Sequence, residues 1–175
     1  MINIKLKKGL SLIILIILVL SISGCIESSI VGEDFVFIDL DGNERHLSDF
    51  YGKVIVLDLM GVNCQPCFYE MFELKKISEN YSSENVAIIS IDVWVTYGEN
   101  MELLKEYKQF FNQEYDIDLD WTFGLDDESG TIFYKYSNEG VPTMYILDKN
   151  GNIYYSNVGY TDYLSLTKKL DELIK

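Results

Sequence analysis

The sequence predicts an α/β domain: a mixed central sheet flanked by helices, with an N-terminal β-hairpin extension and an insertion after the second core strand. Nearly continuous apolar runs at 53–60 and 86–93 are typical of central strands that are covered on both faces. The helix-length segment between them favours a parallel, right-handed β-α-β unit. Extended segments at 143–147 and 152–158, joined by a turn with Asn-Gly at its tip, predict an antiparallel hairpin near the end of the chain.

Residues 1–25 have the three parts of a secretory signal: a lysine-bearing start, an apolar run at 10–20 and a small-residue stretch. The run is short for a membrane span, which takes about 20 apolar residues. Ile-Ser-Gly-Cys at 22–25 resembles a bacterial-type lipobox, in which Cys25 would be lipidated after cleavage. The alternative is an uncleaved signal anchor. Either interpretation attaches the domain to the outer side of the cell membrane through its N-terminus, with residues 26–33 as a tether and residues 34–175 as the domain.

The domain begins with alternating apolar and polar residues at 34–40, followed by the turn signal Asp-Gly-Asn at 41–43 and a second extended piece. This pattern predicts the hairpin that precedes the main sheet. Ser48 is the expected N-cap of a short helical turn after the hairpin, and Gly52 is expected to end that turn.

From Pro66 to about Tyr81 the pattern predicts an amphipathic helix that packs on the sheet. Its apolar residues recur at helical spacing. Its charged residues are expected on the opposite side, toward solvent: Glu70, Glu73, Lys75, Lys76 and Glu79.

After the second core strand, a second amphipathic helix is expected at 100–111, then a short extended piece at 121–125 and a helical turn at 131–136. Thr161 or Asp162 is the expected cap of a closing helix that runs to the C-terminus.

A Cys-x-x-Cys pair, Cys64 and Cys67, stands where the first buried strand passes into the first helix. The thiolate is the reactive form of cysteine, and the free N–H groups at a helix start stabilise negative charge. Pro66 fits the first helical turn, where its missing N–H costs nothing. Cys64 is therefore predicted to be the exposed attacking thiol, and Cys67, one turn into the helix, the resolving thiol.

Two structural interpretations compete with redox chemistry. A zinc site needs four ligands, yet after Cys25 the chain adds only His46 as an imidazole to the two cysteines. A purely structural disulfide across so short a loop would stabilise the fold little. The sequence therefore favours a redox dithiol that uses no metal and no cofactor.

Asp58 lies in the middle of the apolar strand, six residues before Cys64. Burial of an ionised carboxylate is costly, so the pKa of Asp58 is expected to rise, which would let it exchange protons with Cys67. The alternative is an aspartate that faces solvent or accepts a backbone hydrogen bond.

The order of strand, Cys-x-x-Cys, helix, strand and helix, followed by Gly-Val-Pro-Thr at 140–143 before a hairpin, resembles the thioredoxin-like fold. The leading hairpin, the membrane attachment, the long segment 95–130 and the stretch VPTMYILDKNG at 141–151 resemble its membrane-anchored branch. That branch is the TlpA and ResA type of thiol–disulfide oxidoreductase, in the AhpC/TSA–Redoxin superfamily. The resemblance covers nearly everything after about Asp34.

This resemblance implies roles for further residues. Pro142 would be the family's cis-proline, packed against the dithiol, and Val141 would pair its backbone with an extended substrate segment. An ordinary trans proline is the alternative. Gln65 and Pro66, between the cysteines, are counted with Val141 as substrate-binding residues. Glu99 is a candidate for an acid near the active site, with a helix N-terminal acid as the alternative.

The resemblance also implies an activity: electron exchange with protein thiols and disulfides, supported by an upstream membrane electron donor. Asp58 matches the buried acid of thioredoxins. The family's usual tryptophans before the first cysteine are replaced by Met60 and Asn63. Gln65 and Asn63 bring no charge to the dithiol, and Glu70 and the acidic surface disfavour a thiolate, so a reductant is expected more than a strong oxidant.

The formal net charge of −14 and the lack of a basic patch argue against nucleic-acid binding. A peroxiredoxin-like peroxidase is the first rival activity, but peroxide reduction needs an arginine near the thiolate, and Arg45 is the only arginine. The second rival is a non-enzymatic metal-delivery lipoprotein that uses Cys64, Cys67 and His46.

Overall fold

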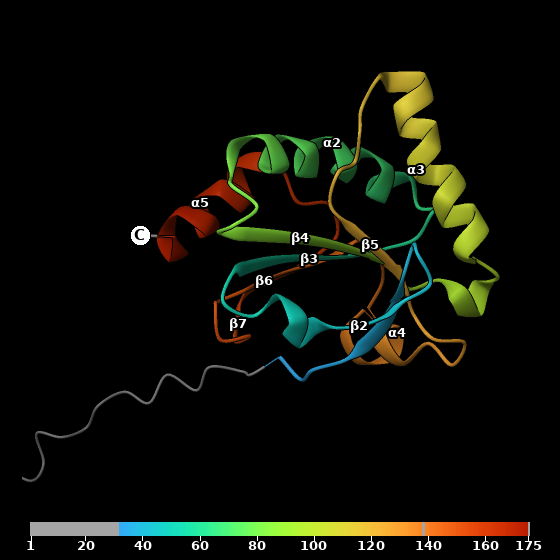
Figure 1. Ribbon diagram of the computed structural model, residues 1–175, viewed down its shortest axis with the longest axis horizontal. Helices are drawn as coiled ribbons and strands as arrows, with labels where there is room; N and C mark the ends of the chain where they lie inside the picture. Colours follow the sequence, from blue (N-terminus) through green and yellow to red (C-terminus); the bar gives the residue numbers. More distant parts are fainter. Residues whose placement is uncertain (1–31, 138, 175) are drawn as a thin grey trace, which may run out of the picture.

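The computed structural model describes residues 32–137 and 139–174 of the 175-residue chain. One seven-stranded sheet runs through the domain in the order β2-β1-β5-β4-β3-β6-β7 (Figure 1). Its strands are β1 (Val36–Asp39), β2 (Glu44–His46), β3 (Val54–Met60), β4 (Val86–Asp92), β5 (Thr122–Leu125), β6 (Thr143–Leu147) and β7 (Ile153–Val158).

Helices cover both faces of the sheet (Figure 1). Three long ones lie on one face: α2 (Gln65–Asn80), α3 (Met101–Tyr115) and α5 (Tyr163–Leu173). The short helix α4 (Thr131–Tyr136) and the 3-10 turn η1 (Leu47–Phe50) lie on the other, and a second 3-10 turn, η2 (Val95–Tyr97), follows β4. The predicted class, an α/β domain with a mixed sheet between helices, is confirmed.

The centre of the sheet is β3, which pairs in parallel with β4 and antiparallel with β6. In this register Asp58 stands between Ser90 of β4 and Met144 of β6. β5 pairs in parallel with β4 and antiparallel with β1, so it joins the N-terminal hairpin to the main sheet. The parallel β-α-β unit and both predicted hairpins are confirmed.

Two hydrophobic cores follow from the alternation of side chains along β3. Val56 and Met60 pack under α2, α3 and α5, whereas Ile55, Leu57 and Leu59 pack against η1 and α4. All five side chains are fully or almost fully buried. A central strand that is apolar on both faces therefore fixes both layers of the domain.

The prediction that Ser48 caps the first helical turn is wrong. His46 occupies the N-cap position of η1, and its N–H donates to the Asp49 carboxylate at 3.0 Å. Ser48 instead bonds with Asp34, through its N–H and its hydroxyl, each at 2.9 Å. Asp34 lies 14 residues before Ser48, so a capping pattern that considers only neighbouring residues does not include it. Gly52 ends the turn with a positive φ of 95°.

The predicted signal segment, Cys25 and residues 26–31 of the predicted tether lie outside the described residues. Gly32 and Glu33, the last two tether residues, contact the domain. The Gly32 N–H donates to the Gly151 carbonyl at 3.1 Å, and the Tyr136 hydroxyl donates to the Glu33 carbonyl at 2.5 Å. Within the described part of the chain, every helix is too short or too polar to cross a membrane.

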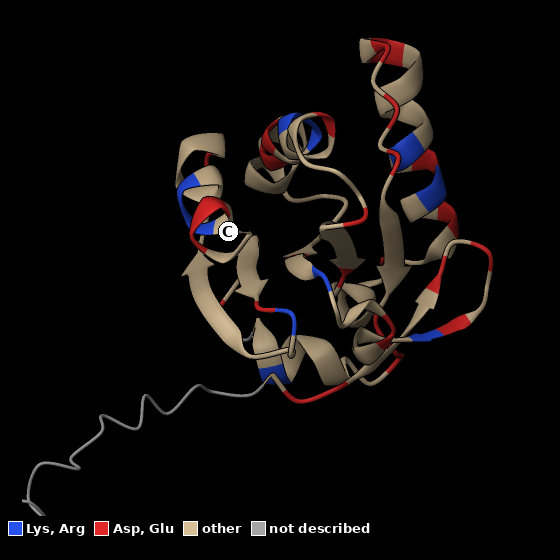
Figure 2. Ribbon diagram, turned by 60° about the vertical axis from the view of Figure 1, so that its left-hand side comes forward, with Lys and Arg blue, Asp and Glu red and all other residues tan. Residues whose placement is uncertain are grey.

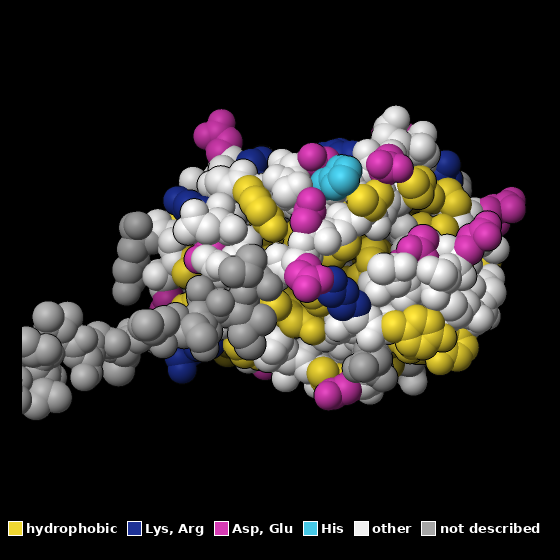
Figure 3. Space-filling model, turned by 90° about the horizontal axis from the view of Figure 1, so that it is seen from below, with side chains coloured by type: hydrophobic (Ala, Val, Ile, Leu, Met, Phe, Trp, Pro, Cys, Tyr) yellow, Lys and Arg dark blue, Asp and Glu magenta, His cyan; other side chains and the backbone are white. Residues whose placement is uncertain are grey.

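Acidic side chains are spread over the helices and loops, and the fewer basic ones are scattered among them (Figure 2). The face under η1 and the N-terminal hairpin carries scattered hydrophobic side chains between acidic and polar ones (Figure 3). His46 lies on the hairpin at this surface, 3.4 Å from the Asp34 carboxylate.

Candidate active site

The two cysteines of the Cys-x-x-Cys pair form a disulfide at the start of α2. Cys64 is the N-cap residue, and its Sγ accepts the N–H of Cys67 at 3.2 Å. Cys64 is buried, with 5% of its surface exposed, which corrects the prediction of an exposed thiol, and Cys67 is fully buried. Gln65 and Pro66 are the first two helical residues, and both are exposed. An N–H group of the helix start thus points at the sulfur of the less buried cysteine, where it would stabilise a thiolate.

Asp58 is fully buried at the centre of β3. It alternates with Val56 and Met60, so its carboxyl faces the layer between the sheet and α2. Neither oxygen has a hydrogen bond of normal geometry with the described residues. Burial raises the pKa of Asp58 well above its usual range, and its polar neighbours Ser90 and Glu70 moderate the rise. The carboxyl is therefore poised to hold a proton near neutral pH.

Glu70 corrects the prediction that the charged residues of α2 face solvent, because it is fully buried. It lies three residues after Cys67 and one before Met71, on the inner face of the helix. One oxygen accepts the Thr161 N–H at 2.6 Å, and the other has no partner among the described residues. Burial, and then the charge of Asp58, raise the pKa of Glu70. Glu70, on the inner face of α2, and Asp58, on the strand β3 that this helix covers, thus form a buried pair of carboxyls.

Glu99 holds the loop that leads from β3 to Cys64. It is 4% exposed and follows η2, yet its two oxygens accept three hydrogen bonds from that loop. The donors are the Val62 N–H at 2.7 Å, the Asn63 N–H at 2.8 Å and the Asn63 side-chain amide at 2.7 Å. The structure therefore places Glu99 against the residue that precedes Cys64, while Asn100 caps α3.

A second group of buried carboxyls, Asp92 and Asp126, lies next to Glu99, and neither residue was predicted to belong to the site. Asp92, the last residue of β4, accepts the Trp94 N–H at 2.9 Å through one oxygen. Burial raises the pKa of Asp92, and so do the neighbouring Glu99 carboxyl and the charge of Asp126. Asp126 accepts two N–H groups from the start of α4, at 3.0 and 2.9 Å. The sequence signal that could have identified Asp92 is the same as for Asp58: an acidic residue within an apolar strand.

The Val141–Pro142 peptide bond is cis, as the family resemblance implies. The next residue, Thr143, pairs with Leu59 in the register of β6 and β3. Pro142 therefore lies at the end of β3 from which the chain passes to the cysteines. Val141 is half-buried between the two cores.

Trp94 packs on Gly61, three residues before Cys64. A Cβ on Gly61 would lie 2.5 Å from the ring of Trp94, so a larger residue does not fit without movement. Met60 and Asn63 stand where the family resemblance leads us to expect tryptophans before the first cysteine. Trp94, which lies in the loop after β4, is a tryptophan from a different part of the chain that packs on this segment.

His46 and Arg45 lie on β2, four strand positions away from β3. The Arg45 guanidinium is bound to Asp49 at 3.1 Å. No group of three histidine, cysteine or acidic residues that could hold a metal occurs in the described ranges. This arrangement supports neither a metal site built from His46 and the cysteines nor a peroxidase site built from Arg45.

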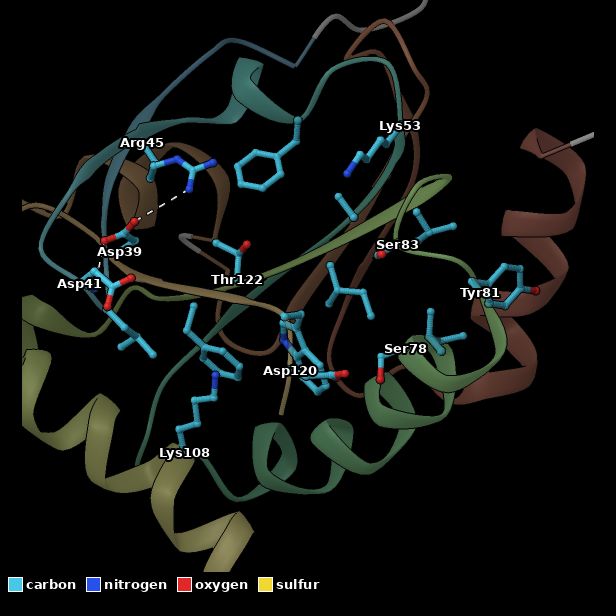
Figure 4. Close-up of a pocket in the computed structure, with 18 residues that line it drawn as sticks. Asp39, Asp41, Arg45, Lys53, Ser78, Tyr81, Ser83, Lys108, Asp120 and Thr122 are labelled. Atoms are coloured by element: carbon cyan, nitrogen blue, oxygen red, sulfur yellow. Dashed lines mark hydrogen bonds and ion pairs between the residues drawn. The ribbon is translucent and has the colours of Figure 1, made fainter. Parts of the chain in front are cut away.

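Two cavities lie at opposite ends of the sheet. One, of about 460 Å³, is next to the dithiol loop and is lined by Asn63, Trp94, Tyr97, Glu99, Phe133, Glu139 and Gly140. The other, of about 550 Å³, lies between the end of α2 and the starts of β4 and β5 (Figure 4). Lys53, Lys108 and Arg45 line the second cavity. The cysteines follow the opposite ends of the strands, so only the first cavity adjoins the dithiol.

The mixed sheet, the dithiol at the start of α2 and the proline before β6 define a thioredoxin-like protein. The Redoxin family matches residues 30–172, and the chain belongs to this family.

Two solved structures share the fold. A putative thiol:disulfide interchange protein DsbE from Chlorobium tepidum is 21% identical, with a TM-score of 0.69 over 84% of this chain and 97% of that chain. A thiol-disulfide isomerase from Corynebacterium glutamicum is 20% identical, with a TM-score of 0.70 over 86% of this chain and 99% of that chain.

Among relatives by sequence, the thiol-disulfide oxidoreductase ResA of Geobacillus kaustophilus is 29% identical over 120 residues. This match covers 69% of the present chain and 63% of the ResA chain, so the chain spans less than two thirds of that relative. The thioredoxin-like fold and the membership in the Redoxin family agree with the resemblance seen in the sequence.

Proposed function

We propose that this protein is a thiol–disulfide oxidoreductase that exchanges electrons with protein disulfides through Cys64 and Cys67. The observation that carries the proposal is the disulfide at the start of α2, in which Cys64 is the less buried cysteine, together with the two buried carboxyls of Asp58 and Glu70 between the sheet and this helix. The match to the Redoxin family and the similarity to ResA support the same activity.

In the reducing direction, the Cys64 thiolate attacks one sulfur of a substrate disulfide. A mixed disulfide forms, and the first substrate sulfur leaves as a thiolate. Cys67 then loses its proton to the pair of carboxyls, Asp58 and Glu70, and attacks the Cys64 sulfur. The internal disulfide closes and the second substrate sulfur leaves as a thiolate. Two electrons pass to the substrate, and two protons complete its thiols.

Of the other site residues, Pro142, Val141, Gln65 and Pro66 face the substrate in this proposal, and Glu99 positions the dithiol loop. Pro142 packs against the dithiol, and the backbone of Val141 pairs with an extended substrate segment. Gln65 and Pro66 are exposed between the cysteines and contact the same segment. Glu99 acts through its hydrogen bonds to the loop before Cys64 and is a positioning residue.

The proposed direction is reduction of the substrate. Asp58, which is partly ionised near neutral pH, opposes a thiolate nearby, and Asn63 and Gln65 bring no positive charge to the dithiol, so the reduced form gains little stability, unlike that of a strong oxidant. The expected potential lies closer to the about −270 mV of thioredoxin than to the about −120 mV of DsbA. Equilibration of the full chain with a glutathione or dithiothreitol buffer measures it, and a DsbA-like value would reverse the assigned direction.

The proposed location is the outer side of the cell membrane, where a membrane donor would return electrons to the dithiol. The signal-like residues 1–25, the lipobox-like Cys25 and the tether at 26–33 support this. Fractionation of a bacterial host with mass analysis of the N-terminal peptide tests it. A lipidated Cys25 in the membrane fraction, lost in Cys25→Ala, is expected. An intact N-terminus in the membrane would indicate a signal anchor, and an intact N-terminus in the cytoplasm would contradict the location.

The activity itself is tested by reduction of insulin disulfides with dithiothreitol as electron donor. The full chain in detergent should accelerate the reaction, and Cys64→Ser should abolish the acceleration. A rate no higher than that of dithiothreitol alone would overturn the proposed function.

A further inference from the structure

The cavity of about 460 Å³ lies beside the path proposed for the substrate. Asn63, the neighbour of Cys64, lines it from the dithiol loop, and Gly140 lines it from the segment before Val141 and Pro142. A polypeptide that pairs with Val141 and brings a cysteine to Cys64 would pass this cavity. A side chain close to the substrate cysteine can therefore reach into it.

Three aromatic rings form a continuous row in the cavity wall. The centroids of Trp94 and Tyr97 are 5.8 Å apart, and those of Tyr97 and Phe133 are 5.9 Å apart with an edge-on angle of 81°. Trp94 is fixed by its contact with Gly61, and Phe133 is 8% exposed. Tyr97 is 69% exposed, so ring surface is available to a ligand. Aromatic faces attract cations.

The charged lining of the cavity is negative. Among the described residues that line it, Glu99 and Glu139 are the two ionisable side chains other than Tyr97, and none is a lysine, arginine or histidine. Glu99 is already bound to the loop, whereas Glu139 is exposed. Asp92 is a further buried carboxyl near Glu99. A substrate carboxylate would be repelled here, and an uncharged side chain would gain nothing from Glu139.

We propose that this cavity is a subsite for a basic side chain, lysine or arginine, next to the reactive cysteine of the substrate protein. The inference rests on the proposed function. The ammonium or guanidinium group lies over the ring of Tyr97 and pairs with Glu139, while its methylene stem contacts Trp94 and Phe133. The substrate class is thus a disulfide-bonded polypeptide with a basic residue beside the cysteine.

The test uses cyclic disulfide peptides that are identical except for one residue beside a cysteine: lysine, norleucine or glutamate. Norleucine keeps the apolar stem and removes the charge. The second-order rate constant for reduction of each peptide by the pre-reduced full chain is measured, with bis(2-hydroxyethyl) disulfide as a small uncharged disulfide that has no such side chain. The lysine peptide is expected to react about threefold to tenfold faster than the norleucine peptide. This ratio should fall at high salt.

Tyr97→Leu and Glu139→Gln should each lower the lysine-to-norleucine ratio toward one and leave the rate with the small disulfide unchanged. The matched controls are Tyr134→Leu, at an exposed tyrosine outside the cavity lining, and Glu114→Gln, at an exposed position on α3. Both controls should keep the wild-type ratio.

Equal rates for lysine and norleucine peptides, or a ratio that neither cavity variant changes, would overturn the subsite. A faster norleucine peptide would also overturn it and identify an apolar subsite instead. These outcomes differ from failure of the proposed function, because in that case the protein would reduce neither the peptides nor the small disulfide.

Discussion

Glu99 accepts two hydrogen bonds from Asn63, one from its N–H at 2.8 Å and one from its side-chain amide at 2.7 Å. A third comes from the Val62 N–H at 2.7 Å. A buried carboxylate after the second core strand thereby fixes the backbone immediately before Cys64. The contact joins residues that are 36 positions apart in the chain.

Glu99→Gln should loosen this loop, because an amide cannot accept through both of its polar atoms. Loss of hydrogen bonds to a charged group is expected to lower the free energy of unfolding by about 1–3 kcal/mol. The change in thermal midpoint measures this, and alkylation of Cys64 across pH reports on the loop itself. Glu106→Gln, at an exposed position of α3, is the control. A variant with wild-type stability and an unchanged alkylation profile would show that Glu99 does not position the loop.

Asp58→Asn should slow the step in which Cys67 closes the internal disulfide. The raised pKa of Asp58 lets it accept a proton near neutral pH, and an amide cannot. Stopped-flow release of the second substrate thiol is expected to slow by on the order of 10²-fold. The rise of this rate with pH should lose the inflection that belongs to Asp58. An unchanged pH profile would remove Asp58 from the mechanism. The control is Asp118→Asn, at an exposed position, which should keep the wild-type rate and pH profile.

The buried carboxyl pair should also make stability depend on pH. The pKa values of Asp58 and Glu70 are raised in the folded protein, so it keeps protons that the unfolded chain loses above about pH 4. The free energy of unfolding should therefore fall as pH rises through the raised pKa values, by up to about 1.4 kcal/mol per pH unit for each group.

Thermal unfolding of the disulfide form between about pH 5 and pH 8 measures this dependence without a contribution from the thiols of Cys64 and Cys67. Glu70→Gln removes one titrating group and should flatten the curve, whereas Glu84→Gln, at an exposed position, should not. A midpoint that stays constant or rises over this range would contradict the assignment.

Gly61→Ala should destabilise the protein, because the new Cβ would lie 2.5 Å from the ring of Trp94. The expected loss is about 1–3 kcal/mol. Trp94→Leu in the same chain should recover part of it, since the smaller side chain makes room. Denaturant unfolding of both single variants and the double variant gives the coupling. Purely additive losses would show that the two residues do not compete for this space.

Most of the fold could be predicted because its signals are local. Apolar runs marked β3 and β4, Asn-Gly marked the last hairpin, and the cysteines marked the start of α2. Asp58 was found because an acid interrupts an apolar strand. Asp92 gives the same signal at the end of the next strand, but it was interpreted only as a strand residue and not as part of the site.

The rest of the site depends on long-range contacts or on burial that contradicts residue type. Glu70 was assigned to solvent because it is charged, although its spacing of three from Cys67 places it on the inner face of α2. The bonds from Glu99 to the dithiol loop and the packing of Trp94 on Gly61 form only when β4 pairs with β3. The cavity beside the dithiol combines residues from three separate segments, so no local pattern contains it.

The central claim is that Cys64 attacks a substrate disulfide and Cys67 resolves the intermediate. Cys67→Ser and Cys64→Ser, each combined with Cys25→Ser so that one cysteine remains, are reduced and mixed with a cyclic disulfide peptide, and intact-protein mass spectrometry detects the product. Cys67→Ser should accumulate a covalent peptide adduct on Cys64, and Cys64→Ser should form little, since its remaining thiol is buried. An adduct that forms equally fast on Cys64→Ser, or on neither variant, would contradict the assigned roles.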